Sequence, residues 1–470
     1  MKKIITLLVL SFIFSAQAQQ VQWAQKLMKF SSDLGGKQNG IKRILGKPDA
    51  FPQCGNSPNG WSPKNALDGR EVVVVGFEKP QLVKQIAIFE NLNAGCVNRV
   101  FVSADGEKFE AVWSRKSDYK TPLYKTTLST DRNYYFGRKR RKVQEAPQAV
   151  NPGIERIFLE TPVSNVVAVK VEFVFALVPG QKQIDAIGIS DSETPMEAKI
   201  NSKPELENLA SPVLLSLGNL QPSGPVISPD GKLYFSGINQ KEEIYVTTYL
   251  GNDKWDSATL LPEFSQNGSY NYLELINENF ALTGGATYDK GTGDSGYTVF
   301  KNNNGTYENQ GQLKIAAFNN YNDTSDATMT SDGKTLILAI ETDFTQGSLD
   351  LYYAHQKEDG TYGFLQNMGK IVNSAAEESN PQLLSDAKTL LFASNGFSSN
   401  GNYDLFVSYR LDDTWKNWSE PVNLGSKINT IHFEGQPFYD EKNERLYYVT
   451  SVEDTLQMKS IHLPKKYLKQ

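Results

Sequence analysis

The chain has 470 residues, of which 39% are hydrophobic, 11% aromatic and 21% charged, and its formal net charge is −5. This length allows two or three domains, and the composition is that of a globular protein. The negative charge argues against a nucleic-acid-binding protein, which would carry a basic surface. After the N-terminal leader, no stretch approaches the roughly 18 consecutive apolar residues of a membrane-spanning helix, so no transmembrane segment is predicted.

The N-terminus has the pattern of a signal peptide. Lys2 and Lys3 precede an apolar stretch at residues 4–14, and the Ala-Gln-Ala sequence at residues 16–18 provides a small-x-small cleavage site. We therefore predict that residues 1–18 are removed and that the protein is exported to the periplasm, the outer membrane or the exterior. No cysteine stands at the cleavage point, so a lipoprotein is not expected.

Residues 19–190 are predicted to form a β-rich domain, because they contain short runs rich in β-branched and aromatic residues between turn-forming residues. These runs are "EVVVVGF" from Glu71, "VKQIAIFE" from Val83, "RVFVSADG" from Arg99, "RIFLE" from Arg156, "AVKVEFVF" from Ala168 and "QIDAIGIS" from Gln183. Ahead of them, Trp23, Leu27 and Phe30 occur at helical spacing and predict a short amphipathic helix that packs against this domain.

The chain has two cysteines, Cys54 and Cys96, and both lie in this domain. In an exported protein two cysteines of one domain usually pair, so we predict a disulfide; the alternative is two buried thiols. A metal site is not expected, because the three histidines lie far away in the C-terminal half.

The order of these runs resembles that of a discoidin or galactose-binding-like β-sandwich. The resemblance is carried by a Gly-Phe-x-x-Pro segment at residues 76–80 and by "VSADGEKFEAVW" from Val102. Residues 45–65, which include Trp61, look like the entry segment of such domains in envelope proteins. The resemblance implies a rim of loops that often holds a sugar or a lipid head group, and Trp61 is our candidate ligand-binding residue there. The identity of the ligand does not carry over.

Five consecutive basic residues form the strongest local charge feature: Arg138, Lys139, Arg140, Arg141 and Lys142. Like charges repel one another, so the run is expected to be exposed. One interpretation is a solvated loop between strands. The other is a contact for an anionic partner, such as lipid head groups or an acidic glycan.

A polar segment rich in Ser, Pro and Glu follows at residues 191–210 and is predicted to be a linker. Beyond it, residues 211–465 repeat one phrase, an Asp-containing tight turn followed by an alternating apolar run. Equivalent positions are Asp230, Asn277, Asp332, Asp386 and Asp440, and the steps between them are 47, 55, 54 and 54 residues. A period near fifty residues with alternating strands predicts a β-propeller.

The repeats also predict how the ring closes. The last repeat lacks its own closing phrase, while "SPVLLSLGNL" from Ser211 resembles that phrase and precedes the first repeat. We expect residues 213–217 to complete the final blade, which would remove two free sheet edges. This arrangement gives five blades, or six if residues 267–318 contain an additional sheet.

The repeat "SPDGKLYFS" from Ser228 resembles the TolB-type, WD-like repeats of exported envelope proteins. Such propellers often precede an OmpA-like peptidoglycan-binding domain, which is not expected here because the chain ends at Gln470. Asp230, Asp332, Asp386 and the equivalent Asp440 are interpreted as turn formers whose carboxylates accept backbone N–H groups.

No catalytic machinery is predicted. "GDSGY" from Gly293 resembles a protease nucleophile motif but has no histidine in a suitable context, and no Gly-x-Ser-x-Gly motif is present. The sequence therefore predicts an exported, non-catalytic binding or scaffold protein of the bacterial cell envelope, without a cofactor, whose propeller loops recognise a protein or a glycan. The alternative is a glycan-processing enzyme that uses carboxylates at the propeller mouth.

Overall fold

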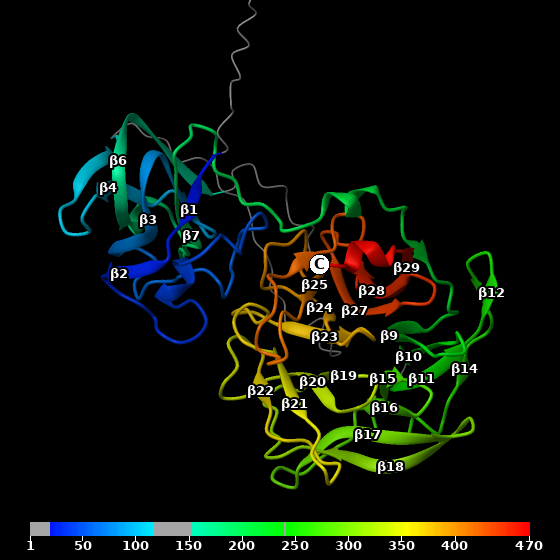
Figure 1. Ribbon diagram of the computed structural model, residues 1–470. Helices are drawn as coiled ribbons and strands as arrows, with labels where there is room; N and C mark the ends of the chain where they lie inside the picture. Colours follow the sequence, from blue (N-terminus) through cyan, green and yellow to red (C-terminus); the bar gives the residue numbers. More distant parts are fainter. Residues whose placement is uncertain (1–18, 117–152, 239–240) are drawn as a thin grey trace, which may run out of the picture.

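The computed structural model describes residues 19–116, 153–238 and 241–470. In these residues the chain is all-β: strands β1–β7 form an N-terminal domain, and β8–β29 form a ring of five blades (Figure 1). The predicted all-β class with a five-bladed propeller is confirmed. The predicted signal peptide lies outside the described residues. No helix within the described ranges is long and apolar enough to cross a membrane.

The N-terminal domain is one seven-stranded sheet with the order β1-β7-β3-β6-β4-β5, and β2 pairs with β3 off this path. Its elements are β1 (Val21–Trp23), β2 (Lys26–Phe30), the 3-10 helix η1 (Ile41–Ile44), β3 (Arg70–Phe89), β4 (Val97–Ser103), β5 (Glu110–Ser114), β6 (Ile154–Val174), the 3-10 helix η2 (Phe175–Leu177) and β7 (Ala186–Ser190). The predicted β-sandwich of two separate sheets is not confirmed. The long strands β3 and β6 belong to both halves of the sheet and so join them into one.

The two long strands bend together rather than ending. Their pairing register shifts between Gly76 and Gln85, and Pro80, which has no N–H to donate, lies inside this interval. On one side of the bend β3 pairs with β2, and on the other side it pairs with β7. Side chains from both halves, including the fully buried Val75 and Ile88, share one hydrophobic core.

The segment that was predicted as a short helix is instead two strands. Val21 pairs with Ser190 across β1 and β7, and β2 pairs with β3. Trp23 packs on Phe89 with the ring centroids 5.3 Å apart, whereas Phe30 is 42% exposed. The helical spacing was misleading because pairing with sheet edges far away in the sequence decides the conformation of so short a segment.

Each propeller blade is a four-stranded antiparallel sheet. In chain order the strands are β9 (Gln221–Ile227), β10 (Leu233–Ile238), β11 (Glu242–Thr247) and β14 (Thr259–Leu260) in blade 1; β15 (Tyr272–Ile276), β16 (Phe280–Gly284), β17 (Asp294–Asn303) and β18 (Thr306–Lys314) in blade 2; β19 (Asp326–Met329), β20 (Thr335–Ile340), β21 (Asp350–His355) and β22 (Gln366–Asn367) in blade 3; β23 (Glu378–Leu383), β24 (Thr389–Ser394), β25 (Asp404–Tyr409) and β26 (Val422–Asn423) in blade 4; and β27 (Phe433–Asp440), β28 (Arg445–Val452), β29 (Thr455–His462) and β8 (Val213–Leu214) in blade 5. The first strands β9, β15, β19, β23 and β27 contact one another around the centre (Figure 1).

Blade 5 is closed by the strand that precedes blade 1. Leu214 of β8 pairs with Lys459 of β29, and Leu215 N–H donates to the Met458 carbonyl at 2.9 Å. The predicted closure is confirmed. Because β8 and β29 come from opposite ends of the propeller sequence, the ring leaves neither terminal sheet edge open.

The repeat aspartates lie at the turns between the first and second strands. The Asp386 carboxylate accepts the N–H groups of Lys388 and Thr389, both at 2.8 Å. Asp440 accepts the N–H of Lys442 at 3.0 Å. In these bonds the donors are backbone N–H groups, which are present whatever side chain follows. The turn therefore depends on the aspartate carboxylate, which recurs in the repeats.

The N-terminal domain docks on the propeller through buried polar contacts. Asn59 is 1% exposed; its amide donates to the Gly396 carbonyl at 2.6 Å, and its Oδ1 accepts the Ala375 N–H at 3.1 Å. The residues between the domains are also packed: Leu206 of the 3-10 helix η3 (Pro204–Asn208) is fully buried. The chain ends with the 3-10 helix η4 (Lys465–Leu468) against the last two blades.

Candidate active site on the propeller axis

Each first strand brings a polar or small residue to the axis of the ring at equivalent positions. In blades 1, 4 and 5 this position is a β-bulge at Gly224, Asn380 and Gln436, whose φ values are 54°, 50° and 52°. In blade 2 the register also shifts at this position, which holds Glu274, and in blade 3 the position holds Asp326 in a regular pair with Ala339. A bulge re-aims a side chain out of the strand's regular alternation, so these side chains can reach the neighbouring blade.

Hydrogen bonds link these positions from blade to blade. Asp326 accepts the N–H of Asn380 at 3.0 Å and its side-chain amide at 2.8 Å. Asn380 Oδ1 accepts the N–H of Gln436 at 3.2 Å, and Gln436 Oε1 accepts the N–H of Gly224 at 2.8 Å. The backbone N–H of Ala327 hydrogen-bonds to the Glu274 carboxylate. The pattern stops at blade 1, because Gly224 has no side chain to continue it.

Three carboxylates gather where the pattern stops: Glu242, Glu274 and Asp326, which we call the axial carboxylates. Glu242 begins β11, and its Oε1 accepts a hydrogen bond at 2.8 Å from Ser223 Oγ in the first strand of the same blade. All three side chains are half-buried. Their charges interact, because the charge of Asp326 raises the pKa of both Glu242 and Glu274, and the charge of Glu242 also raises the pKa of Glu274.

Burial is the main cause of the pKa shifts in this cluster. It raises the pKa of Glu242 to about 7, against the opposing effect of the Ser223 hydrogen bond. It raises the pKa of Glu274 well above its usual range, and the charge of Asp326 adds to this effect. The pKa of Asp326 is also raised by burial, but the two hydrogen bonds from Asn380 favour its ionised form. The cluster therefore combines Glu274, whose pKa lies well above its usual range, with Asp326, in which two hydrogen bonds oppose the rise in pKa that burial causes.

Glu274 also has an unusual carboxylate oxygen. Its Oε1 is buried and has no hydrogen-bond partner within the described part of the chain. Two tyrosines close the site on this side: Tyr297 donates to Ser325 Oγ at 2.8 Å, and Tyr272 donates to the Ser325 carbonyl at 3.3 Å. Burial raises the pKa of both phenols, so they remain neutral beside the carboxylates.

Other buried carboxyls of the propeller have a structural role by contrast. Glu378 accepts hydrogen bonds from the N–H and Oγ of Ser374 and from Ser394 Oγ. Glu434 makes the equivalent bonds to Thr430 and to a threonine of β28 one blade later. Burial raises the pKa of each to about 8. Both oxygens of these groups are used in shaping a loop, so a raised pKa alone does not mark the site.

No group of three or more His, Cys, Asp or Glu side chains among the described residues has the arrangement of a metal site.

The residues predicted from the sequence do not come together at this site. Trp61 is 0% exposed and packs on Phe173 in the core of the N-terminal domain, with the ring centroids 6.2 Å apart. Its proposed contact with a ligand is corrected, because the core already covers the ring. The basic residues Arg138, Lys139, Arg140, Arg141 and Lys142 lie outside the described residues.

The two cysteines are both buried, and the structure places no disulfide between them. Cys54 Sγ lies 3.4 Å from the Pro52 carbonyl, and Cys96 Sγ lies 3.6 Å from the Asn93 carbonyl. The structure therefore corresponds to the alternative of two buried thiols, and the disulfide stays a prediction for the exported protein.

The axial carboxylates were not identified from the sequence, although a signal was present. Asp326, Asn380 and Gly224 each lie six residues before the aspartate of the following turn, at Asp332, Asp386 and Asp230. Alignment of the first strands to these turns would have shown an acidic residue where other repeats have Asn or Gly. Glu242 gives no such signal, since it lies on a third strand.

The similar solved structures include enzymes that act on glycans. An α-L-arabinofuranosidase from Lactobacillus brevis is 15% identical, with 52% of this chain and 90% of that chain covered and a TM-score of 0.35. A thermostable family-43 glycoside hydrolase is 11% identical, with coverage of 53% and 91% and a TM-score of 0.34. A family 32 carbohydrate-binding module from Streptococcus pneumoniae EndoD is 11% identical, with coverage of 36% and 99% and a TM-score of 0.24.

No protein-family model matches the chain, and no curated protein matches it in sequence. The TolB-type and discoidin-like resemblances therefore receive no support from a family match.

The comparison corrects the predicted function. Glycoside hydrolases recur among the similar solved structures, and nothing supports a non-catalytic binding or scaffold protein. The prediction that the chain is not an enzyme is contradicted by this finding, and the alternative of a glycan-processing enzyme becomes the proposal below. At these identities and TM-scores the similarities do not define an activity, so the chemistry has to be derived from the chain's own carboxylates.

Proposed function

We propose that the protein is a glycan-processing enzyme that hydrolyses a glycosidic bond at the axial carboxylates. The observation that carries the proposal is the contrast within the cluster. Glu274 has a pKa well above its usual range and an oxygen with no hydrogen-bond partner among the described residues, whereas two hydrogen bonds from Asn380 oppose the rise that burial causes in the pKa of Asp326. Glycoside hydrolysis needs such a pair, one carboxyl that donates a proton and one carboxylate.

In the proposed reaction Glu274 protonates the glycosidic oxygen as its bond to the anomeric carbon breaks. The Asp326 carboxylate stabilises the positive charge that develops at that carbon and takes a proton from the water that attacks it. The sugar leaves with a new hydroxyl group. Asp326 then releases its proton to solvent and Glu274 takes one up, so both groups return to their starting states. Glu242 acts as a positioning residue, because its negative charge raises the pKa of Glu274 and keeps the acid protonated.

The geometry of the blades indicates the face from which a glycan would enter. Asp326 begins a first strand and Glu242 begins a third strand, so both lie at the end of the blade opposite the turns of Asp230 and Asp332. Ala375 and Gly396, which bind the N-terminal domain, lie in loops at this same end. The N-terminal domain thus borders the proposed entrance, which agrees with its resemblance to galactose-binding-like modules.

Export and the TolB-type resemblance are part of the same proposal. The leader at residues 1–18 and the TolB-type phrase from Ser228 support an exported envelope protein that acts on an envelope glycan. The run from Arg138 to Lys142 would serve as an additional contact for an anionic surface. Determination of the N-terminal residue of the protein recovered from its native host tests export, since cleavage after Ala18 is expected.

The activity is tested with the chain from residue 19 onward and a panel of aryl glycosides and oligosaccharides, with released sugar as the readout. Wild-type protein should hydrolyse at least one substrate. Glu274→Gln and Asp326→Asn should each lower kcat by about 10²- to 10⁴-fold, the usual contribution of a general acid or base. Glu378→Gln is the matched control, because it changes a buried carboxyl with a raised pKa outside the site, and its kcat should stay within about twofold. Full activity in both axial variants would contradict the proposal.

A further inference from the structure

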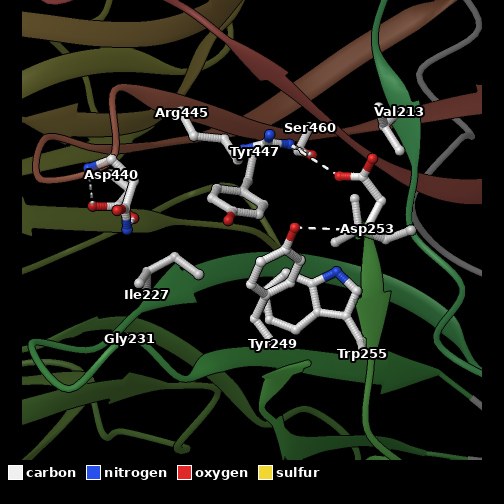
Figure 2. A pocket seen from close by; sticks show the side chains of 12 residues that line it. Val213, Ile227, Gly231, Tyr249, Asp253, Trp255, Asp440, Arg445, Tyr447 and Ser460 are labelled. Carbon is white, nitrogen blue, oxygen red and sulfur yellow. Dashed lines mark hydrogen bonds and ion pairs between the residues drawn. The ribbon is translucent and has the colours of Figure 1, made fainter. Parts of the chain in front are cut away.

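A second feature of the propeller has the composition of a ligand site and lies away from the axis. It is a cleft of about 280 Å³ between blade 1 and blade 5. Its aromatic lining is Tyr249, Trp255 and Tyr447, and its charged lining is Asp253, Asp440 and Arg445 (Figure 2). We call it the rim cleft.

The rim cleft exists because blade 1 departs from the repeat. Between its third and fourth strands the chain forms an extra hairpin, β12 (Tyr249–Gly251) and β13 (Lys254–Trp255), which pairs only with itself. Asn252 and Asp253 form its tip with φ values of 52° and 57°, the left-handed conformation that two-residue hairpin turns require. The hairpin carries its aromatic side chains beyond the blade and over the neighbouring blade 5.

Trp255 shows the consequence of this departure. Two of its repeat equivalents, Tyr362 and Trp418, are each 2% exposed and fill the space between adjacent blades, while the third, Tyr307, is half-buried. Trp255 is only half-buried, and Tyr249 beside it is 46% exposed. The rings of Tyr249 and Trp255 lie 5.2 Å apart at 57°, and Tyr447 meets Trp255 edge-on at 6.3 Å. An exposed aromatic cluster in a concave site is typical of a ligand contact rather than of a core.

The polar lining decides the kind of ligand. Arg445 donates to Ser460 Oγ at 2.8 Å and lies 3.8 Å from the Asp253 carboxylate (Figure 2). Asp440 accepts hydrogen bonds from Asn443 and from the backbone. Two carboxylates face one guanidinium, so the cleft carries no excess positive charge with which to attract an anion. Burial raises the pKa of Tyr447 to about 12, so its phenol remains a neutral donor.

We propose that the rim cleft binds a neutral sugar unit of a glycan. A pyranose ring has an apolar C–H face that can stack on the exposed ring of Tyr249 or Trp255, and its hydroxyl groups can bind carboxylate and guanidinium groups that are partly satisfied by one another. Asp253 and Arg445 keep 49% and 29% of their side chains exposed, so both can exchange water for sugar hydroxyls.

The rim cleft is separate from the axial site. It is formed at the turns that follow the first and third strands, as Gly231 and Asp253 show, whereas Asp326 and Glu242 lie at the opposite strand ends. A sugar bound there is not the unit that is cleaved. The cleft would hold the protein on a glycan, independently of whether the axial carboxylates hydrolyse one.

Isothermal titration calorimetry of the chain from residue 19 tests this site. The panel contains neutral sugars (glucose, galactose, arabinose, N-acetylglucosamine and their disaccharides) and two acidic sugars (glucuronic and galacturonic acid). We expect a neutral sugar to bind, and Tyr249→Ala and Trp255→Ala each to weaken its binding by about tenfold or more. Glu274→Gln should bind the same sugar as tightly as wild type, which separates the rim cleft from the axial site.

Phe364→Ala is the control for loss of an exposed aromatic, since Phe364 is 71% exposed on blade 3 and should not contribute. Thermal unfolding of each variant shows whether Trp255→Ala still folds; Tyr249 is exposed enough for its variant to decide the matter alone. Three results would overturn the proposal: no neutral sugar binds at millimolar concentration, only acidic sugars bind, or neutral sugars bind equally well to wild type and to Tyr249→Ala.

Discussion

At the scale of single residues, the buried carboxyls of this propeller divide into two kinds. Glu378 and Glu434 use both oxygens to hold loops, and they are equivalent residues of neighbouring blades. Glu274 has an oxygen with no partner in the part of the chain that the structure describes, and its pKa is raised by two other acids, Asp326 and Glu242. The same burial thus gives a structural acid in one place and a reactive one in another, and hydrogen bonding distinguishes them.

The raised pKa of Glu378 should make the free energy of unfolding depend on pH. Burial raises the pKa of Glu378 to about 8, so between the unfolded pKa of about 4.3 and this value the folded state binds a proton that the unfolded state has released. The free energy of unfolding should therefore fall as the pH rises through this window. Glu378→Gln removes this titration, so its midpoint of thermal unfolding should improve relative to wild type between pH 5 and pH 8.

The exposed Glu263 offers a control. Glu263→Gln should shift the midpoint of thermal unfolding equally at pH 5 and at pH 8. An equal shift for Glu378→Gln at pH 5 and pH 8 would show that Glu378 has an ordinary pKa in the folded protein.

Substitution of Glu242 should change how the rate of the proposed reaction depends on pH. Its charge raises the pKa of Glu274, so Glu242→Gln should lower that pKa. Because the reaction needs Glu274 protonated, the alkaline limb of the kcat/KM profile should move to lower pH, while kcat at the optimum should fall far less than in Glu274→Gln. An unmoved alkaline limb would remove Glu242 from its positioning role.

At the scale of elements, β8 is the strand on which the ring depends. It has only two residues, Val213 and Leu214, but it pairs with β29, and Leu215 next to it is 6% exposed in the core between blades 1 and 5. Its energetic contribution comes from that buried side chain and from the edge that it covers.

Leu215→Ala should lower the free energy of unfolding by about 2–5 kcal/mol, the usual cost of truncating a buried leucine. Leu214→Ala is the matched neighbour on the same segment, 55% exposed, and should change it by no more than about 0.5 kcal/mol. Urea unfolding followed by tryptophan fluorescence measures both. Similar values for the two variants would mean that the closing segment does not pack as described.

At the scale of the whole molecule, the two domains are joined by buried polar contacts. Asn59 satisfies the Ala375 N–H and the Gly396 carbonyl inside the interface. Asn59→Ala should leave both groups buried and unpaired, at a cost of about 1–3 kcal/mol for each unsatisfied group.

Hydrogen exchange of a peptide that contains Ala375 should be faster in the Asn59→Ala variant than in wild type. Lys47→Ala removes an exposed ion pair with Glu420 in the same interface and should leave this exchange rate unchanged, since exposed pairs contribute little. Unchanged exchange in Asn59→Ala would contradict the described docking.

The sequence allowed the propeller, its blade number and its closing strand to be predicted, because each depends on a repeat that can be aligned. It did not allow the conformation of residues 21–30 to be predicted, since their partners in β3 and β7 lie far along the chain. The burial of Trp61 and the docking of Asn59 depend on equally distant contacts. Glu274 escaped notice because its blade has the most degraded repeat, where the register of the first strand is hardest to align.

The proposed acid role of Glu274 is tested most directly with two substrates that share one sugar and differ in the leaving group. One is the oligosaccharide cleaved by wild-type protein, and the other is the 2,4-dinitrophenyl glycoside of the same sugar, whose leaving group needs no proton. Glu274→Gln should lose about 10²- to 10⁴-fold in kcat/KM on the oligosaccharide and less than about tenfold on the dinitrophenyl glycoside. An equal loss on both substrates, or no loss on either, would contradict the assignment of Glu274 as the general acid.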